Sequence, residues 1–186
     1  MTAIADAKIL ILDTNGFEQS ELEFPRDQLR AKGATVHVAT PDGEPIKGWD
    51  DKNWGREAKA DLAIHAALVA DYDAMVLPGG QMNPDILRMN TEAVSLVKGF
   101  HDEGKIVAAV CHGPWLLVEA GIVKDRDVTS WPSLKTDLVN AGGKWHDMEV
   151  VVDEGIITSR NPGDLEAFVS KIVEEIEEGR HERSAA

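Results

Sequence analysis

The sequence predicts an α/β fold in which a mostly parallel central sheet carries helices on both faces. Short apolar runs alternate along the chain with amphipathic stretches, as in repeated strand–helix units. The runs are continuously apolar rather than alternating, which is typical of strands buried on both faces. We expect residues 1–186 to form one domain, with a frayed tail at 181–186.

The elements follow from local patterns taken in order. Apolar or alternating runs predict strands, and amphipathic stretches with Gly, Pro or Ser at their ends predict helices. The expected strands are 8–13, 35–40, 73–78, 106–110 and 127–131, and the segments 149–153 and 155–159 should form either a hairpin or two consecutive short strands. The expected helices are 17–32, with Pro25 predicting a kink or a late start, 91–104, 115–120, 133–141 with Ser133 as N-cap, and 164–178.

Between the second strand and residue 60 the chain becomes polar. Residues 41–60 contain three glycines and two tryptophans, so we expect a surface excursion with a short hairpin. Three other polar turns each follow a predicted strand of the parallel sheet: 13–18, 78–80 and 111–112. We expect these turns to meet at the carboxyl edge of the sheet, where ligands bind in such folds.

Composition limits the possible partners and compartments. The formal net charge of −14 argues against nucleic acid and anionic membrane surfaces as partners. No apolar run approaches the length of a membrane span, and the N-terminus lacks the features of a secretory signal. A single cysteine permits no internal disulfide, so we expect a cytoplasmic protein.

That cysteine, Cys111, is the strongest candidate for a reactive group. It follows the apolar run 106–110 and precedes Gly113-Pro114, so it lies on a sharp turn from strand to helix, the geometry of a nucleophile elbow. A lone cysteine is often only a small core residue, but a core position requires neither a following histidine nor a Gly-Pro pair. The positive end of the following helix is expected to favour the thiolate.

Two glycines after the strand at 73–78 are candidates for an oxyanion hole. Gly79 and Gly80 permit a backbone N–H to approach a ligand closely, and the N–H of His112 follows the nucleophile. The alternative is that the glycine pair only makes a tight turn.

The sequence indicates the acid–base partners of Cys111 less clearly than it indicates the nucleophile. Glu18 either complements the positive end of its helix or shares a proton with the sulfur, and spacing alone leaves both open. His112 is a candidate base, although neighbouring side chains on an elbow need not face each other. The other histidines are scattered singly, which predicts no metal site. No His-x-Glu pair lies between Cys111 and the final helix, which argues against a glutaminase triad.

Motifs spread through nearly the whole chain resemble those of the PfpI family in the ThiJ/PfpI superfamily. They are NGFEQSEL (15–22), YDAMVLPGG (72–80), PDILR (84–88), GKIVAAVCHGPWLLVEAG (104–121), TSWPSLKTDLVNAGGKW (129–145) and EVVVDEGIITSRNPGDLEAF (149–168). The combination of AVCHGP with TSRNPGDL is the most specific part of the match.

The resemblance implies a flavodoxin-like, glutamine-amidotransferase-like α/β/α sandwich and a homodimer, often assembled into a hexamer. It also implies Cys111 as nucleophile, Glu18 as its paired carboxylate and His112 beside it, with no cofactor. An acidic residue from a neighbouring subunit can orient the histidine in this family. The matching position is Asp85, where aspartate replaces glutamate and the preceding loop is one residue longer.

The function implied is that of a cysteine-dependent stress hydrolase acting on reactive dicarbonyls or early glycation adducts, with a small aldehyde or a glycated protein as substrate. One alternative is an ATP-independent intracellular cysteine peptidase. A second, from another class, is a non-catalytic redox sensor or chaperone in which Cys111 is a low-pKa thiol that oxidises.

Overall fold

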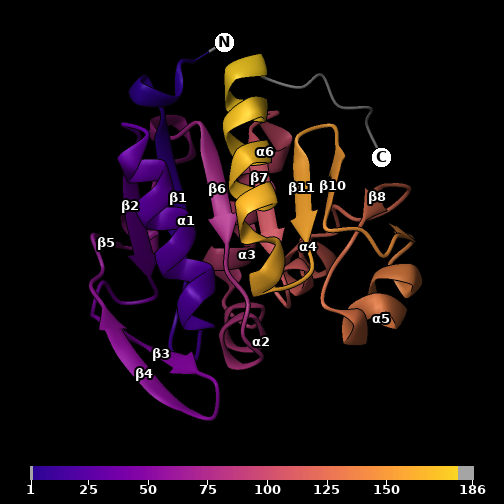
Figure 1. Ribbon diagram of the computed structural model, residues 1–186, viewed down its shortest axis with the longest axis horizontal. Coiled ribbons are helices and arrows are strands. Elements are labelled where there is room, and N and C mark those ends of the chain that lie inside the picture. Colours follow the sequence, from indigo (N-terminus) through magenta and orange to yellow (C-terminus); the bar gives the residue numbers. More distant parts are fainter. Residues whose placement is uncertain (1, 180–186) are drawn as a thin grey trace.

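The computed structural model describes residues 2–179, which are built around a seven-stranded sheet in the order β10-β11-β7-β6-β1-β2-β5 (Figure 1). Every neighbouring pair is parallel except β10 with β11. The strands are β1 (Lys8–Leu12), β2 (Thr35–Thr40), β5 (Leu62–Ala63), β6 (Ala74–Leu77), β7 (Ile106–Val110), β10 (Val150–Asp153) and β11 (Ile156–Ser159).

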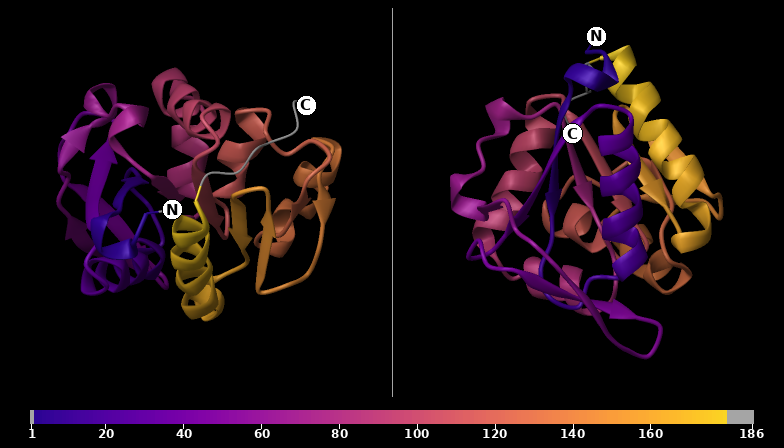
Figure 2. Two further views of the ribbon diagram at one scale, coloured as in Figure 1. Left: turned by 90° about the horizontal axis from the view of Figure 1, so that it is seen from above. Right: turned by 60° about the vertical axis from the view of Figure 1, so that its left-hand side comes forward.

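Helices cover the sheet on both faces. Helices α1 (Gln19–Ala31) and α6 (Leu165–Glu178) lie side by side on one face, and α3 (Thr91–Asp102) and α4 (Pro114–Glu119) cover the other (Figures 1 and 2). Two short helices, α2 (Met82–Leu87) and α5 (Lys135–Asn140), complete the set. Short 3-10 turns span Ile4–Asp6, Ile64–Ala66, Val69–Asp71, Pro132–Leu134 and Pro162–Asp164.

The alternation of side chains along the strands creates two apolar cores, one on each face. In β1, Ile9 and Ile11 are buried in the cluster that contains residues of α1 and α6. Leu10 and Leu12 are buried in the other cluster, with residues of α3 and α4. The continuous apolar run of β1 is therefore explained by burial on both faces, and the predicted α/β sandwich is confirmed.

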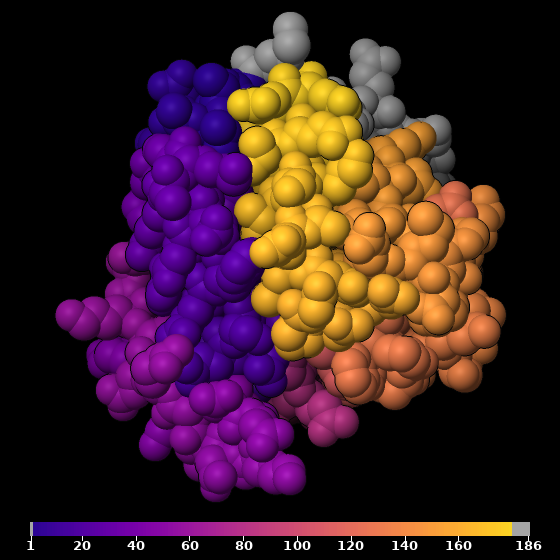
Figure 3. Space-filling view, in the orientation of Figure 1, coloured from indigo at the N-terminus to yellow at the C-terminus, as the bar shows by residue number. Residues whose placement is uncertain are grey.

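Two small pairs of strands lie outside the main sheet. The antiparallel hairpin of β3 (Ile46–Asp50) and β4 (Asn53–Ala58) extends past the carboxyl edge of the sheet, at the lower edge in Figures 1 and 3. This is the hairpin expected within 41–60. The second pair, β8 (Asp127–Val128) with β9 (Lys144–Trp145), is parallel.

Some local predictions need correction. Helix α1 begins at Gln19 and runs through Pro25, so the late start is wrong. Ser133 is not an N-cap, because it lies within the 3-10 turn Pro132–Leu134 that leads directly into α5. Helix α2 was not expected, since six residues that include Pro84 carry little helical periodicity. The tail at 181–186 lies outside the described residues.

The topology brings the polar strand ends together. Strands β1, β6 and β7 are neighbours in the sheet, so Asp13, Pro78 and Cys111 follow adjacent carboxyl ends. An isolated bridge between Glu18 and Trp49 joins the hairpin to the start of α1 at this edge. Within the part of the chain described, no helix is both long enough and apolar enough to span a membrane.

Candidate functional site

Cys111 occupies the turn between β7, which ends at Val110, and α4, which begins at Pro114. Its φ of 61° lies in the left-handed region, which is strained for a residue with a side chain. Bonds on either side hold this conformation: the Cys111 N–H donates to Ser159 O at 3.0 Å, and the Gly113 N–H donates to Val110 O at 2.8 Å. The predicted elbow is present, and Cys111 is 6% exposed.

The carboxyl group beside the sulfur belongs to Glu21. This residue of α1 is fully buried, its Oε2 accepts the Gly79 N–H at 2.9 Å, and the carboxyl is close enough to the Cys111 thiol for each group to shift the pKa of the other. Desolvation by burial raises the pKa of Glu21 to about 8, and the thiol and backbone hydrogen bonds only partly oppose it. At neutral pH the carboxyl therefore holds a proton.

The prediction that Glu18 is paired with the sulfur is corrected. Glu18 is the N-cap residue of α1, with extended backbone angles, and its Oε1 accepts the Ser20 hydroxyl at 3.2 Å. Glu21 lies within the first turn of the helix, on the buried side that faces the elbow. Glu18 instead lines the cavity above Cys111. Burial raises the pKa of Glu18, and the nearby Asp50 and Asp51 act in the same direction.

The Cys111 thiol is less acidic than an ordinary cysteine. Desolvation is the largest cause of its raised pKa, and the Glu21 charge adds to it. The N–H groups of Gly80 and His112 act in the opposite direction without overcoming burial. Burial therefore opposes the stabilisation of the thiolate that we expected from the helix N-terminus.

The two glycines have different roles. The Gly79 N–H is already bonded to Glu21, so it is not free to bind an oxyanion as we expected. A Cβ at Gly79 would lie 2.5 Å from Glu21 Oε2 and 2.7 Å from Cys111 Cβ, so only glycine lets these residues meet. Gly80 has φ of 79°, and its N–H and that of His112 both interact with the sulfur. These two N–H groups remain candidates for the oxyanion hole.

His112 faces Cys111 despite being its chain neighbour. Its Nδ1 lies 3.1 Å from the Cys111 Sγ, and its ring packs against Trp131, at 6.1 Å and 23°, and against Trp115. The ring is 5% exposed, and desolvation lowers its pKa to about 4, so it is neutral at pH 7. Its buried Nε2 has no hydrogen-bond partner among the described residues, which leaves it available to a bound group.

A cavity of about 740 Å³ opens above these residues. Its walls come from the elbow, the start of α1, the loop after β6, and the β3–β4 hairpin. Sequence analysis missed several of the residues that line it: Glu21, Trp49, Asp50, Asp51, Met82 and Trp131. Glu21 had a detectable signal, because it precedes the buried Pro25 by four residues and therefore shares its face of α1.

Asp85 does not join the site within one chain. It is an exposed residue of α2, and the role implied for it depends on a second subunit. Among residues 2–179, no group of three or more His, Cys, Asp or Glu side chains could hold a metal ion. The His146 Nε2 lies 2.5 Å from Asp127 Oδ1.

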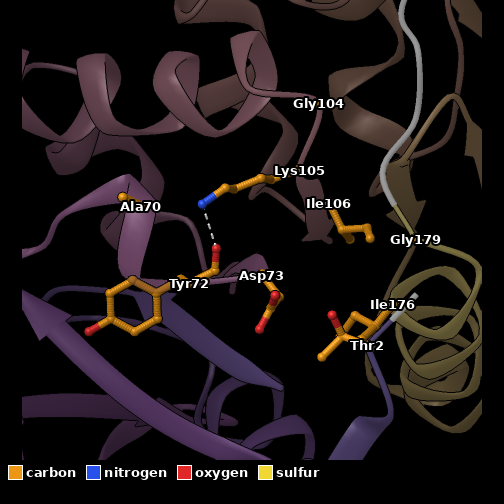
Figure 4. Close-up of a pocket in the computed structure, with 9 residues that line it drawn as sticks. All are labelled: Thr2, Ala70, Tyr72, Asp73, Gly104, Lys105, Ile106, Ile176 and Gly179. Atoms are coloured by element: carbon orange, nitrogen blue, oxygen red, sulfur yellow. Dashed lines mark hydrogen bonds between the residues drawn. The ribbon is translucent and has the colours of Figure 1, made fainter. Parts of the chain in front are cut away.

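A second cavity, of about 400 Å³, lies at the opposite edge of the sheet (Figure 4). It is lined in part by Tyr72, Asp73 and the buried Lys105. The Lys105 ammonium donates to the Tyr72 carbonyl at 2.7 Å and also to the Val69 carbonyl, so backbone oxygens already compensate its burial. We assign this lysine a structural role.

Comparisons with known proteins show the family of this chain. The model of the DJ-1/PfpI family matches residues 7–175. The chain is 41% identical over 166 residues to "Deglycase TK1284" of Thermococcus kodakarensis, covering 89% of this chain and 97% of that protein. It is 38% identical over 162 residues to "Putative cysteine protease YraA" of Bacillus subtilis, covering 87% and 93%. Drosophila melanogaster DJ-1beta superimposes with a TM-score of 0.83 at 30% identity, covering 95% of this chain and 91% of that one.

Proposed function

Because this chain belongs to the DJ-1/PfpI family, we propose that it is a cysteine-dependent hydrolase that acts on reactive dicarbonyls or early glycation adducts. The observation that carries the proposal is the buried pair of Cys111 and Glu21 at the base of a cavity. A thiol is a good nucleophile toward aldehyde carbon, and a carboxyl with a pKa of about 8 can exchange protons near neutral pH. The relatives named as deglycases support the same chemistry.

With methylglyoxal as substrate, the steps balance without a cofactor. The Cys111 sulfur attacks the aldehyde carbon, and a proton passes to the aldehyde oxygen, giving a hemithioacetal. Removal of the carbon-bound proton, together with protonation of the ketone oxygen, gives an enediol. Protonation at the neighbouring carbon, with loss of the hydroxyl proton from the sulfur-bearing carbon, then gives a thioester. Water then hydrolyses the thioester, releasing lactate and the free thiol.

We assign these proton transfers to two groups, with support from the geometry of the site. Glu21 donates to the first oxygen and can exchange the carbon-bound proton, because its carboxyl is protonated at rest and lies beside the sulfur. His112 is neutral, and its Nδ1 can accept the thiol proton across 3.1 Å. The N–H groups of Gly80 and His112 face the developing negative charge.

Lactate formation from methylglyoxal by the purified, reduced protein tests the proposal. Turnover should disappear in Cys111→Ala, which removes the nucleophile from a buried position with little change in packing. The control is Cys111→Ser, which keeps a weak nucleophile and should lose at least about a thousandfold in rate. Equal lactate formation by wild type and Cys111→Ala would overturn the proposal.

A peptidase is the second candidate, because a relative carries a cysteine-protease name and the cavity is open to solvent. Peptide hydrolysis requires the same nucleophile and oxyanion donors, together with room for an extended chain. Casein cleavage that survives repurification and is absent from Cys111→Ala would favour it. Oxidation of Cys111 that changes the assembly, without any turnover by the reduced protein, would favour the redox-sensor alternative instead.

We further propose a cytoplasmic homo-oligomer, at least a dimer, in which Asp85 of one copy orients His112 of another. In support, Asp85 is exposed on α2, beside the exposed apolar side chains of Ile86 and Met89. Sedimentation of the wild type and of Met89→Lys tests the assembly. The activity of Asp85→Asn then tests whether its carboxylate reaches the histidine.

A further inference from the structure

Asp13 is a fully buried acid that takes no part in the reaction steps given above. It comes directly after β1 and is 0% exposed. Its N–H donates to the Ala39 carbonyl of β2 at 3.1 Å, so the ladder between β1 and β2 continues to this residue. Alternation along the strand places its side chain on the face of Ile9 and Ile11, which is the face that α1 covers. Asp13 therefore lies on the same side of the sheet as Glu21.

A chain of hydrogen bonds connects Asp13 to Glu21. The Thr14 N–H donates to Asp13 Oδ1 at 3.2 Å and to Asn83 Oδ1 at 3.0 Å. The buried Asn83 amide donates to the Gly79 carbonyl at 3.2 Å, and the Gly79 N–H donates to Glu21 Oε2 at 2.9 Å. The two carboxyl groups are thus held by one set of backbone and amide groups that follow β1 and β6.

Each of the two carboxyl groups keeps one oxygen without a partner. Asp13 Oδ2 and Glu21 Oε1 are buried, and neither has a hydrogen-bond partner among residues 2–179. A buried carboxylate oxygen in this state is costly, whereas a protonated carboxyl group can donate to a neighbouring oxygen. The unpartnered oxygens therefore point to a proton that one acid provides to the other.

The surroundings of Asp13 favour its neutral form. Desolvation is the largest cause of its strongly raised pKa, and the Glu21 charge acts in the same direction. The groups that oppose burial are the Thr14 N–H and the Asn83 amide, and both are neutral. Asp13 therefore keeps its proton while Glu21 is ionised, because two uncompensated buried charges repel each other.

The groups that shift the pKa of Glu21 include no cation. They are the Cys111 thiol, the Glu18 carboxyl and backbone N–H groups of the loop after β6. His112 beside the sulfur is also neutral at pH 7, because its pKa is about 4. A Glu21 carboxylate therefore has few groups that stabilise it, and a neutral acid that donates to it would be an effective one.

We propose that Asp13 is a positioning residue for Glu21: it keeps its own proton and donates it toward Glu21 Oε1 when Glu21 is ionised. The proposal rests on the hydrolase function assigned to Cys111, in which Glu21 gives its proton to the substrate oxygen. The two carboxyl groups are not bonded to each other at rest, so the Asp13 O–H stabilises only the carboxylate that this transfer leaves behind. Such an interaction speeds the transfer, because it is stronger after the proton has moved than before. The Asp13 proton stays on Asp13 throughout.

Carboxyl carbon-13 NMR follows both protons without turnover. The protein is labelled at Asp Cγ and Glu Cδ, and the two resonances are assigned with Asp13→Asn and Glu21→Gln. In wild type the Glu21 resonance should titrate near about pH 8. The Asp13 resonance should stay at the position of a protonated acid through that titration.

Two substitutions of Asp13 separate a donor from a charge. Asp13→Asn keeps a side-chain donor of the same shape, so the Glu21 midpoint should stay within about half a pKa unit of wild type. Asp13→Leu removes the donor, so the midpoint should rise by about one unit and kcat should fall about tenfold with KM unchanged. Ile9→Val is the control for packing, because Ile9 is buried on the same face of β1, and it should leave the midpoint and kcat unchanged.

A charged Asp13 would give the opposite sign. Both substitutions would then lower the Glu21 midpoint, because a repelling charge is removed. That result, or an unchanged midpoint in Asp13→Leu, would overturn the proposal. If Asp13→Leu does not fold, the wild-type spectrum decides, because titration of Asp13 at or below the Glu21 midpoint would overturn it as well. If wild type forms no lactate while the midpoints behave as expected, the hydrolase function is wrong and the pairing of Asp13 with Glu21 stands.

Discussion

The backbone N–H of Gly79 donates to Glu21 Oε2 at 2.9 Å, and this bond fixes the carboxyl group beside the Cys111 sulfur. The loop after β6 thereby positions an acid that comes from α1 next to a nucleophile that follows β7. One hydrogen bond thus joins the segments that follow β1 and β6, beside the cysteine that follows β7. The loop that was expected to stabilise an oxyanion mainly holds the acid instead.

Substitution of Glu21 should alter both the rate and its pH dependence. Burial raises the pKa of Glu21 to about 8, so the first proton that the Cys111–Glu21 pair loses should be that of the carboxyl group. The resulting Glu21 charge keeps the pKa of the Cys111 thiol raised, so alkylation of Cys111 in wild type should stay slow through about pH 8. In Glu21→Gln the midpoint of alkylation should move downward, because the charge that raises the pKa of the thiol is removed.

Glu18→Gln is the matched control for this prediction. The Glu18 carboxyl is hydrogen-bonded to the Ser20 hydroxyl and acts on the site through the charge of Glu21, so its substitution should move the alkylation midpoint less than Glu21→Gln does, while Glu21→Gln should also lose about a hundredfold in kcat. An unchanged midpoint in Glu21→Gln, or an equal shift in both variants, would show that the pairing is wrong.

The raised pKa of Glu21 should also make stability depend on pH. The folded protein keeps a proton that the unfolded chain loses near pH 4.5, so the contribution of Glu21 is present at low pH and is lost as pH rises toward about 8. Between pH 6.5 and 8 the expected loss is about 2 kcal/mol in the free energy of unfolding. Urea titrations of wild type and Glu21→Gln would measure it, and the variant should show a flatter profile.

Gly79→Ala should disrupt the site more than an ordinary glycine substitution. The new Cβ would lie 2.5 Å from Glu21 Oε2 and 2.9 Å from the His112 N atom, with no space to relax. We expect a loss of roughly 2–3 kcal/mol in stability and of at least about a hundredfold in turnover. Gly121→Ala is the control, because Gly121 has a positive φ but no neighbour within 4 Å; it should cost only about 1 kcal/mol and leave turnover intact.

His112 should stay neutral across the working range of pH. Desolvation lowers its pKa to about 4, so its neutral form should persist well below the usual titration of a histidine near about 6.5. Nitrogen-15 NMR of labelled histidine would follow the titration directly. Trp131→Ala should expose the ring and raise the midpoint, whereas a wild-type midpoint near the usual value would contradict the burial argument.

The central sheet could be predicted from the sequence, because parallel strands that are buried on both faces need uninterrupted apolar runs. The sequence placed β1, β2, β6 and β7 within a residue or so, and Cys111 on its turn. It indicated Glu18 as the paired carboxylate and missed Glu21, which lies within one turn of Glu18 at the start of α1. The choice depends on which residue faces a loop contributed by β6, and that is a long-range contact.

The pKa of the Cys111 thiol could not be predicted from the residues next to it in the sequence either. An elbow before a helix favours a thiolate, but the depth of burial and the neighbouring Glu21 determine the balance. Trp49, Asp50 and Asp51 were seen only as part of a polar excursion, because nothing in 41–60 indicates that its hairpin folds over Cys111. Such contacts arise from tertiary structure alone.

The β3–β4 hairpin has a consequence for how this protein could be redesigned. Nucleophile and acid sit on the rigid ends of β7 and α1, whereas Trp49, Asp50 and Asp51 sit on a ribbon inserted between β2 and β5. Surface connections of this kind tolerate replacement far better than buried strands. The β3–β4 hairpin could therefore be replaced by a hairpin of different charge, which would change the selectivity of the cavity and leave Cys111 and Glu21 in place.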